Sequence, residues 1–587
     1  MKVIGKRVAG LDLNFLKRFL PYLKKSTWLA IFSFGLMIAT NLTGVLQPYF
    51  IKIGIDKDIA NKDWPGLLNT VSILGIVLVA GFIFQFLYNL FIQLLGQRLL
   101  YDLRLDLFKK LLSLSQDYFD RTPVGKTLTN LTNDVESVRQ FISEGVVTVA
   151  GEMLKVIFIF AAMLMVNVRL AILAFITIPL FVVATLFFRK RIRSGYADVR
   201  RANAQINTML MESITGINEI NLFNYQTTSQ ELFGEANRKY LKAFLQVVNS
   251  YSFYFPVIEL VTNAGMILVF LYAHFQMGMT ILVGEIFIFF AYIQMFFRPL
   301  RQLAEKFNLF QSAMAAAERI FKLMDQKSKL TEVYAPTSDP VNIRGDIRFK
   351  SVNFAYQEGQ SVLKDLSFTI NQGEKVALVG TTGSGKTTVI KLLNRLYDVN
   401  TGSITVNGTD IRQYPLSELR RAITTVPQDL FLFTGNALEN ISLYDPGITR
   451  NQVIAAARQV NLDSFIRKLP GAYDENLLEE GKSLSSGQKQ LLSFARAFVR
   501  DSNMIILDEV TANIDSGTEA LIQEATRRLI AEKTAIIIAH RMSTIKLVDR
   551  ILVFHKGELV GDGTHRQLMK EKGIYAQYYR MQSLLSR

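Results

Sequence analysis

Residues 375–388 read KVALVGTTGSGKTT, and this stretch decides the fold of the C-terminal half of the chain. The apolar run KVALVG predicts a buried strand, TTGSGKTT predicts a loop, and the run from Val389 to Leu396 predicts a helix. Gly380 to Thr387 fit the pattern G-x-x-x-x-G-K-T, in which glycines let backbone N–H groups approach phosphate oxygens and the helix dipole favours an anion. The stretch therefore predicts a phosphate-binding loop.

A second stretch, Met504 to Glu509 (MIILDE), is an apolar strand that ends in two carboxylates. In such a Walker B element, Asp508 would hold Mg²⁺ and Glu509 would polarise the attacking water as a general base. Paired acids at a strand end are often merely solvated, but the phosphate-binding loop upstream favours the functional interpretation. From about Ile343, short β-branched runs alternate with glycine-rich turns and amphipathic helices, which indicates an α/β domain.

The composition of the whole chain indicates a membrane protein. Half of its 587 residues are hydrophobic and the mean hydropathy is +0.22. The formal net charge of +16 suits nucleic-acid binding or basic loops beside a membrane, and the hydropathy favours the membrane. The absence of cysteine excludes disulfides and thiolate metal sites, and four histidines argue against a histidine-rich metal site.

Six apolar runs are each long enough to cross a bilayer. They lie near residues 27–49, 67–95, 143–166, 169–188, 247–274 and 280–300. Only the two long intervening segments, 96–142 and 189–246, are strongly basic, which predicts that both lie in the cytoplasm together with both termini. A Pro-Val-Gly break near Asp117 to Asp134 predicts a tight reversal between two helices, either a mere turn or a contact with a motor domain.

Several polar residues fall inside the predicted spans, namely Gln85, Asn89, Glu152, Lys155, Glu259, Asn263, Glu285 and Gln294. Glu152 and Lys155 are one helical turn apart and are interpreted as neutralising each other. Glu259 and Glu285 are better candidates for lining a pathway, because buried charges in membranes usually face a cavity or a partner. The aromatic stretch from Phe287 to Phe297 is interpreted as packing, with contact to hydrophobic substrates as the alternative.

Leu484 to Gln488 (LSSGQ), between the phosphate-binding loop and the Walker B strand, resembles the signature motif of ATP-binding cassette (ABC) proteins. With six preceding spans, the chain resembles an exporter-type half-transporter of the multidrug and lipid-flippase group. The resemblance implies a multi-domain membrane protein, in which a six-helix all-α transmembrane domain precedes an α/β P-loop ABC domain. The expected layout is an interfacial helix (1–25) or an extension of the first span, a transmembrane domain (26–300), a linker (301–340) and an ABC domain (341–587).

The family resemblance also implies roles for single residues. Tyr356 would stack on adenine, Gln428 would sense Mg²⁺ and the lytic water, and His540 would contact the γ-phosphate. Ser485 would cap the γ-phosphate of ATP on the other subunit, and Asp515 belongs to the loop that crosses the dimer interface. The residues expected to contact nucleotide are Tyr356, Gly380, Thr381, Thr382, Gly383, Ser384, Gly385, Lys386, Thr387, Thr388, Ser485, Ser486, Gly487, Gln488 and Asp515. The expected Mg²⁺ ligands are Thr387, Gln428 and Asp508, and the expected catalytic residues are Glu509, His540 and Gln428.

The same resemblance implies an obligate dimer that holds two ATP molecules between its nucleotide-binding domains, and coupling helices near residues 117–126 and 209–217. The usual signature is LSGGQ, but this chain has Ser486 at the third position, and Leu478 replaces a glycine in the preceding loop. Family members with an altered signature often pair with a different chain, so a heterodimer is favoured over a homodimer. Serine is small, however, and a tolerated variant is the alternative.

The function implied is ATP-driven export or flipping of amphipathic drugs, lipids or peptides by alternating access. The rival is a membrane-bound ATPase that gates a channel or regulates a partner without pumping, against which the complete hydrolytic motifs argue. Expected partners are a second half-transporter, membrane lipids and the substrate, but no nucleic acid. The lack of an organellar targeting segment favours a bacterial plasma membrane.

Overall fold

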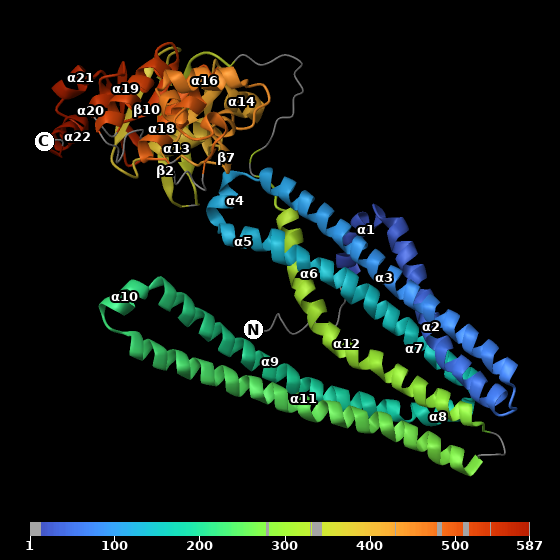
Figure 1. Cartoon of the computed structure of the whole chain (residues 1–587). Coiled ribbons are helices and arrows are strands. Elements are labelled where there is room, and N and C mark those ends of the chain that lie inside the picture. The colour runs from blue at the N-terminus through green and yellow to red at the C-terminus, as the bar shows by residue number, and fades with distance from the viewer. Residues whose placement is uncertain are drawn as a thin grey trace. The chain divides into compact units, whose positions relative to one another are not determined.

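The computed structural model describes residues 13–276, 281–328, 330, 343–357, 359–428, 430–477, 484–508, 516–539 and 542–585. The chain forms two compact units, whose elements are labelled in Figure 1. The helical unit comprises Met1–Leu112 and Gly125–Asp325, and the α/β unit comprises Ser113–Val124 and Gln326–Arg587. The α/β unit therefore includes a short segment that, in sequence, interrupts the helical unit.

The helical unit consists of long helices joined by short turns (Figure 1). In chain order its helical segments, long and short, are α1 Leu13–Lys24, α2 Thr27–Ile53, η2 Gly54–Ile59, α3 Trp64–Leu112, α5 Val124–Thr129, η3 Asn130–Asp134, α6 Val135–Gln140, η4 Phe141–Val146, α7 Val147–Val166, α8 Val168–Phe175, α9 Thr177–Thr215, α10 Ile217–Leu222, α11 Gln226–Gln276 and α12 Val283–Met324. The helix α12 continues well past residue 300, where the predicted linker begins.

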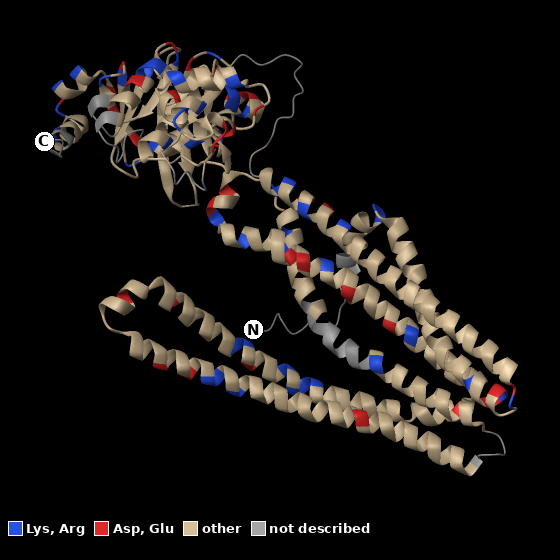
Figure 2. Cartoon of the chain, viewed as in Figure 1, with Lys and Arg blue, Asp and Glu red and all other residues tan. Residues whose placement is uncertain are grey.

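Within the described residues, five stretches are long and apolar enough to cross a membrane. They are Thr27–Ile59, Trp64–Leu112, Val124–Val166, Val168–Thr215 and Gln226–Phe275, and they overlap the first five predicted spans. The sixth predicted span overlaps α12, which is helical but is not among the five. Figure 2 shows long parts of α3 and α11 without acidic or basic side chains, as a lipid-embedded helix requires.

The aromatic face of α12 lies in the core of the helical unit. The side chains of Phe289, Tyr292 and Phe297 are each at most 2% exposed, and the Tyr292 hydroxyl donates a hydrogen bond of 2.9 Å to the carbonyl oxygen of Val45 on α2. A buried phenol needs such a partner, because an unpaired hydroxyl costs free energy in an apolar core. The packing interpretation of this stretch is therefore confirmed for these three residues.

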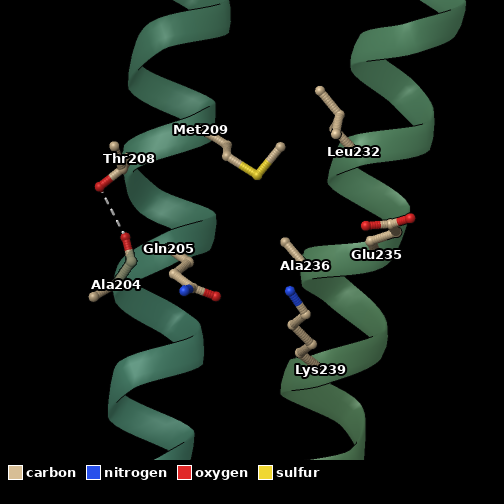
Figure 3. A pocket seen from close by; sticks show the side chains of 8 residues that line it. All are labelled: Ala204, Gln205, Thr208, Met209, Leu232, Glu235, Ala236 and Lys239. Atoms are coloured by element: carbon tan, nitrogen blue, oxygen red, sulfur yellow. Dashed lines mark hydrogen bonds between the residues drawn. The ribbon is translucent and has the colours of Figure 1, made fainter.

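The helices α9 and α11 lie side by side (Figure 1). At Gly195 a Cβ atom would lie 2.8 Å from Cγ2 of Val247, so glycine permits the close approach of the two helices. Nearer α10, the same pair borders a hollow of about 440 Å³ lined in part by the small side chains of Ala204 and Ala236. Figure 3 shows the Met209 side chain reaching from α9 toward α11 in this hollow.

The α/β unit is built around a six-stranded sheet with the order β12-β11-β3-β10-β9-β6. Its strands are β3 Lys375–Gly380, β6 Ile423–Val426, β9 Met504–Asp508, β10 Thr534–Ile538, β11 Arg550–His555 and β12 Glu558–Gly563. All neighbouring strands pair in parallel except β11 and β12. The central strand β10 is buried throughout, as expected for a parallel strand covered on both faces.

A second, antiparallel sheet has the order β2-β1-β4-β5 and adds its apolar face to a shared core. Its strands are β1 Ile347–Ala355, β2 Ser361–Ile370, β4 Thr401–Val406 and β5 Thr409–Asp410. The remaining elements of the unit are α4 Gln116–Arg121, α13 Lys386–Leu393, η5 Ile411–Gln413, α14 Leu416–Ala422, β7 Gly435–Asn436, α15 Ala437–Ser442, α16 Arg450–Gln459, α17 Asp463–Ile466, η6 Ala472–Asp474, β8 Asn476–Leu477, α18 Ser486–Phe498, α19 Ser516–Ile530, α20 Met542–Ile545, α21 His565–Lys570 and α22 Ile574–Leu585.

Candidate nucleotide site

The predicted phosphate-binding loop joins β3 to α13, as the sequence pattern requires. Gly385 precedes the helix with φ of +106°, a left-handed conformation that side chains rarely tolerate. At Gly380, a Cβ atom would lie 2.3 Å from the carbonyl oxygen of Phe554 on the neighbouring strand. The glycines therefore permit the backbone conformation of the loop and its close approach to β11, and the loop leads directly into α13.

Lys386 is held against this loop. Its ammonium donates hydrogen bonds to the carbonyl oxygens of Gly380, at 2.8 Å, and Thr381, at 2.9 Å, and the residue is 5% exposed. Ser384 lies in the same curve with its hydroxyl buried and without a hydrogen-bond partner in the part of the chain that the structure describes. A buried hydroxyl and a lysine ammonium beside a helix N-terminus are suited to a phosphate group.

The parallel strands bring the other predicted residues to the same edge of the sheet. Asp508 ends β9 and pairs with Ile538 of β10, and Ile538 pairs in turn with Leu378 near the end of β3. Gln428 follows β6 by two residues, and the last residue of β6 pairs with Leu507. In parallel α/β sheets, ligands bind at the carboxyl ends of the strands.

This edge fits a magnesium ion together with phosphate oxygens. The hydroxyl of Thr387, the carboxylate of Asp508 and the amide oxygen of Gln428 are the hard oxygen donors that Mg²⁺ prefers. Thr387 and Gln428 are exposed and Asp508 is half-buried. Among the described residues, no group of three or more His, Cys, Asp or Glu side chains could hold a metal ion by itself. Phosphate oxygens would have to complete the coordination.

Three predicted site residues, Glu509, Asp515 and His540, lie outside the described residues, as does Leu478. Their roles therefore stay predictions from the sequence.

Tyr356 lies directly after β1 and close to the phosphate-binding loop. Its hydroxyl is 3.1 Å from the hydroxyl of Thr388, at the start of α13, and the ammonium of Lys391 lies 5.5 Å from the centre of its ring. The structure therefore brings this aromatic side chain to the first turn of α13, although the two segments are separated by 32 positions in the chain. Stacking on adenine remains a prediction.

The signature segment forms the N-terminus of α18. The Ser485 hydroxyl accepts a hydrogen bond from the Gln488 backbone N–H at 3.2 Å, and the Gln488 side chain accepts one from the Ser485 N–H at 2.9 Å. This capping box fixes where the helix begins. Ser486 is exposed in the first turn and Gly487 is buried, so the serine that stands in place of glycine lies at the surface of this chain.

The segment Ser113–Val124, which contains α4, packs as part of the α/β unit and contacts residues around Tyr356. The Tyr397 hydroxyl donates a short hydrogen bond to the carboxylate of Asp120, and the Arg121 guanidinium donates one of 3.0 Å to the Tyr356 carbonyl oxygen. The Tyr397 and Tyr356 rings meet edge to face with their centres 5.1 Å apart. Of the two sequence interpretations of this reversal, the structure favours the contact with a motor domain over the mere turn.

Charge stabilises this contact. Burial acts to raise the pKa of Asp120, but hydrogen bonds from Tyr397 and Gln116 lower it overall. Burial, followed by the hydrogen bond to Asp120, raises the pKa of Tyr397. The pair is therefore a phenol donating to a carboxylate at neutral pH. The sequence analysis singled out the segment from Asp117 to Asp134, which contains Asp120, but it missed Tyr397 and the pairing of the two side chains.

Replacing Tyr397 with phenylalanine is expected to lower the substrate-stimulated ATPase rate about tenfold and to leave the basal rate within twofold. The reason is the lost hydrogen bond to a charged acceptor, which contributes about 1.5 kcal/mol or more. The matched control is Tyr473→Phe, because the Tyr473 hydroxyl also donates to a carboxylate, at 2.7 Å, but to that of Asp463, which is not part of α4. Equal loss of stimulation in both variants would show that α4 does not transmit the signal.

Comparisons with known proteins agree with this geometry. The protein-family model of the ABC transporter transmembrane region matches residues 30–300, and the protein-family model of the ABC transporter matches residues 363–512. The chain is 33% identical over 562 residues to the uncharacterised ABC transporter ATP-binding protein YknV of Bacillus subtilis, covering 95% of this chain and 93% of the relative. It is 34% identical to the probable multidrug resistance ABC transporter ATP-binding/permease protein YheH of the same species, covering 88% and 77%. The solved structure of a bacterial Atm1-family ABC exporter with ATP bound superimposes with a TM-score of 0.76 at 26% identity, covering 95% and 98% of the two chains.

Membrane-crossing helices and a phosphate-binding sheet edge on one chain define a multi-pass membrane protein driven by nucleotide hydrolysis. The chain belongs to the ABC transporter family, and its architecture is that of the exporters. Its α/β unit is the ATP-binding domain, whose ATPase activity is coupled to transport through the helical unit.

Proposed function

We propose that this chain exports amphipathic molecules by ATP-driven alternating access, as one half of a dimer. The observation that carries the proposal is the segment Ser113–Val124, which leaves the helical unit and packs beside Tyr356 in the ATP-binding unit. A change in the nucleotide site is thereby connected by a few contacts to the two helices that flank this segment. ATP binding would bring the two nucleotide-binding domains of the dimer together and open the substrate cavity between the transmembrane helices to the outside. Hydrolysis would return the transporter to its inward-facing state.

Different residues of this chain bind ATP and hydrolyse it. Backbone N–H groups of the loop and Lys386 bind the phosphates, and Tyr356 stacks on the base. Magnesium, held by Thr387, Asp508 and Gln428, would supply the positive charge that offsets the phosphate charge. Glu509 orients and polarises the attacking water and takes its proton, while His540 contacts the γ-phosphate.

The proposed transporter is complete only when a second half-transporter is bound. ABC exporters generally dimerise, and the tip around α10 supports a partner here, because Ile214, Leu222 and Phe223 are between 71% and 79% exposed. Apolar side chains gathered at the end of a cytoplasmic hairpin are stabilised by burial against another surface. In the proposed dimer, Ser485 and the N-terminus of α18 face the ATP held by the other subunit.

This chain has Ser486 where the usual signature has glycine, and this difference favours a heterodimer over a homodimer. The deciding measurement is the ATPase rate of this chain purified alone in nanodiscs, with the subunit stoichiometry determined on the same sample. A dimer with hydrolysis that depends on Glu509 would establish the homodimer. A monomer, or a dimer without activity, would indicate a different partner chain.

The proposed location is a bacterial plasma membrane with both termini in the cytoplasm. The basic residues Arg189, Lys190, Arg191 and Arg193 follow the apolar part of α9, which supports this orientation.

Inverted membrane vesicles test the export function directly. A fluorescent amphipathic dye should accumulate inside them when ATP is added, and Glu509→Gln should abolish the accumulation. ATP hydrolysis without accumulation of any amphipathic probe would instead support an ATPase that gates or regulates.

A further inference from the structure

A polar hollow of about 380 Å³ lies between α2, α3 and α7, within stretches that are apolar enough to cross a membrane. Its lining includes the amide side chains of Asn41, Gln47, Gln85 and Asn89 and the charged side chains of Glu152 and Lys155. We call this hollow the α2–α3–α7 niche. Polar and charged groups at this depth are costly, so they usually serve a partner or a ligand.

Part of the niche is internally satisfied. The amide of Asn41 donates to the carbonyl oxygen of Gly151 at 3.0 Å and thereby ties α2 to α7. The amide of Gln85 donates to the side chain of Asn89 at 3.1 Å, one turn further along α3. These bonds hold the walls of the niche in place and leave further donor and acceptor capacity on each amide.

The charges are not satisfied in this way. Glu152 and Lys155 both lie in the described part of the chain, yet the structure shows no ion pair between them, contrary to the neutralisation expected from the sequence. The Thr40 hydroxyl, also in the lining, is buried and has no hydrogen-bond partner among the described residues. One acid, one base and an unpaired hydroxyl therefore share a single niche, and each would be stabilised by a polar ligand.

Glycine residues determine how closely the helices approach and where the niche stays open. At Gly151 a Cβ atom would lie 2.9 Å from the sulfur of Met37, so glycine lets α2 and α7 approach each other. At Gly44, by contrast, a Cβ atom would meet no atom within 4 Å, because this position opens into the niche. A volume of about 380 Å³ is near the lower end of ligand pockets. It suits a polar headgroup whose apolar tail lies outside, along the helices.

We propose that the α2–α3–α7 niche binds the headgroup of a zwitterionic amphiphile, with Glu152 facing its cationic group and Lys155 its anionic group. Side chains three positions apart on a helix have Cβ atoms about 5–6 Å apart, so each of them can contact one of the two opposite charges of a small headgroup. The amides of Asn41, Gln47 and Gln85 then meet the polar atoms between these charges. This inference rests on the proposed export function and names its substrate class.

Equilibrium binding to the full chain in phosphatidylglycerol nanodiscs tests the proposal. The probe is tritiated dodecylphosphocholine below its micelle concentration, with protein-free nanodiscs as background. Unlabelled dodecylphosphocholine, dodecyltrimethylammonium and dodecyl sulfate are the competitors. In the unaltered chain the zwitterionic compound should compete at least tenfold better than either singly charged compound.

The two charge variants should change which competitor binds most strongly, and each should favour a different one. Glu152→Gln removes the partner of the cationic group and should make the anionic competitor the best, whereas Lys155→Met should favour the cationic one. Gly44→Leu fills the niche and should weaken the binding of the zwitterionic probe at least tenfold. Its matched control is Gly35→Leu on the same helix, where a Cβ atom also meets nothing within 4 Å but which does not line the niche.

Three outcomes would overturn the proposal: equal effects of Glu152→Gln and Lys155→Met on all competitors, equal effects of Gly44→Leu and Gly35→Leu, or competition by tail-less phosphocholine as strong as by the amphiphile. The last would identify a free zwitterion as the ligand. Transport is measured separately, in inverted membrane vesicles with ATP and ATP-regenerating enzymes added outside. Charge-dependent binding without any transport would support the niche and refute export, so the two failures are distinguishable.

Discussion

Replacing Lys386 with alanine is expected to weaken ATP binding at least a hundredfold and to reduce hydrolysis to background. Lys386 is 5% exposed, and its ammonium donates hydrogen bonds to two loop carbonyls, at 2.8 and 2.9 Å, so its charge is held where phosphate oxygens would lie. Each hydrogen bond from a charged donor contributes about 1.5–3 kcal/mol, and about 1.4 kcal/mol corresponds to a tenfold change in affinity. Titration with a fluorescent ATP analogue measures the affinity.

The control for this variant is Lys375→Ala. Lys375 begins the same strand, β3, at the end opposite to the loop, so its removal changes the net charge equally without touching the site. Affinity for ATP should then stay within about twofold of the original. Unchanged affinity in Lys386→Ala would show that the nucleotide binds elsewhere.

Gly380→Ala is expected to destabilise the ATP-binding unit and to abolish ATP binding as well. The new methyl group would lie 2.3 Å from the Phe554 carbonyl oxygen, a backbone atom of the strand paired with β3. The two strands would have to separate, and such overpacking costs about 1–3 kcal/mol, or roughly 2–10 °C in Tm for a unit of this size. Thermal unfolding of the purified protein, followed by intrinsic fluorescence, measures this change.

Gly573→Ala is the matched substitution for this comparison, because a Cβ atom there meets nothing within 4 Å. Its Tm should equal that of the unaltered protein. A Tm for Gly380→Ala that is also unchanged would contradict the close approach of β3 and β11.

The nucleotide edge could be predicted from the sequence because its residues sit in local patterns. The loop from Gly380 to Thr387, and Asp508 at the end of β9, each follow an apolar strand, and parallel pairing then brings strand ends to one edge. No such local pattern marks the contact of Tyr397 with Asp120, since those residues are 277 positions apart and each looks ordinary in its own segment.

Inside the membrane stretches, the sequence predicted polar positions but not their partners. Glu285 was a candidate for lining a pathway, yet it lies 4.0 Å from the ammonium of Lys52 and accepts a hydrogen bond of 3.3 Å from Asn167. Glu152 and Lys155 have the spacing of an ion pair but form none. Spacing along a helix fixes which side chains share a face, whereas the rotamers that join or separate them depend on neighbouring helices.

The inclusion of Ser113–Val124 in the ATP-binding unit has a consequence for how the protein is made. This segment leaves the ribosome about 200 residues before Gln326, the next residue of the same unit. Tyr397, against which Asp120 packs, is made 277 residues after it. At about 5–20 residues per second, the segment therefore waits roughly 14–55 s for this surface. During that interval the carboxylate of Asp120 has no Tyr397 to accept from, and the flanking helices must be inserted without this anchor. The contact between Asp120 and Tyr397 therefore forms only after the helices that flank the segment and the first part of the ATP-binding unit have been made.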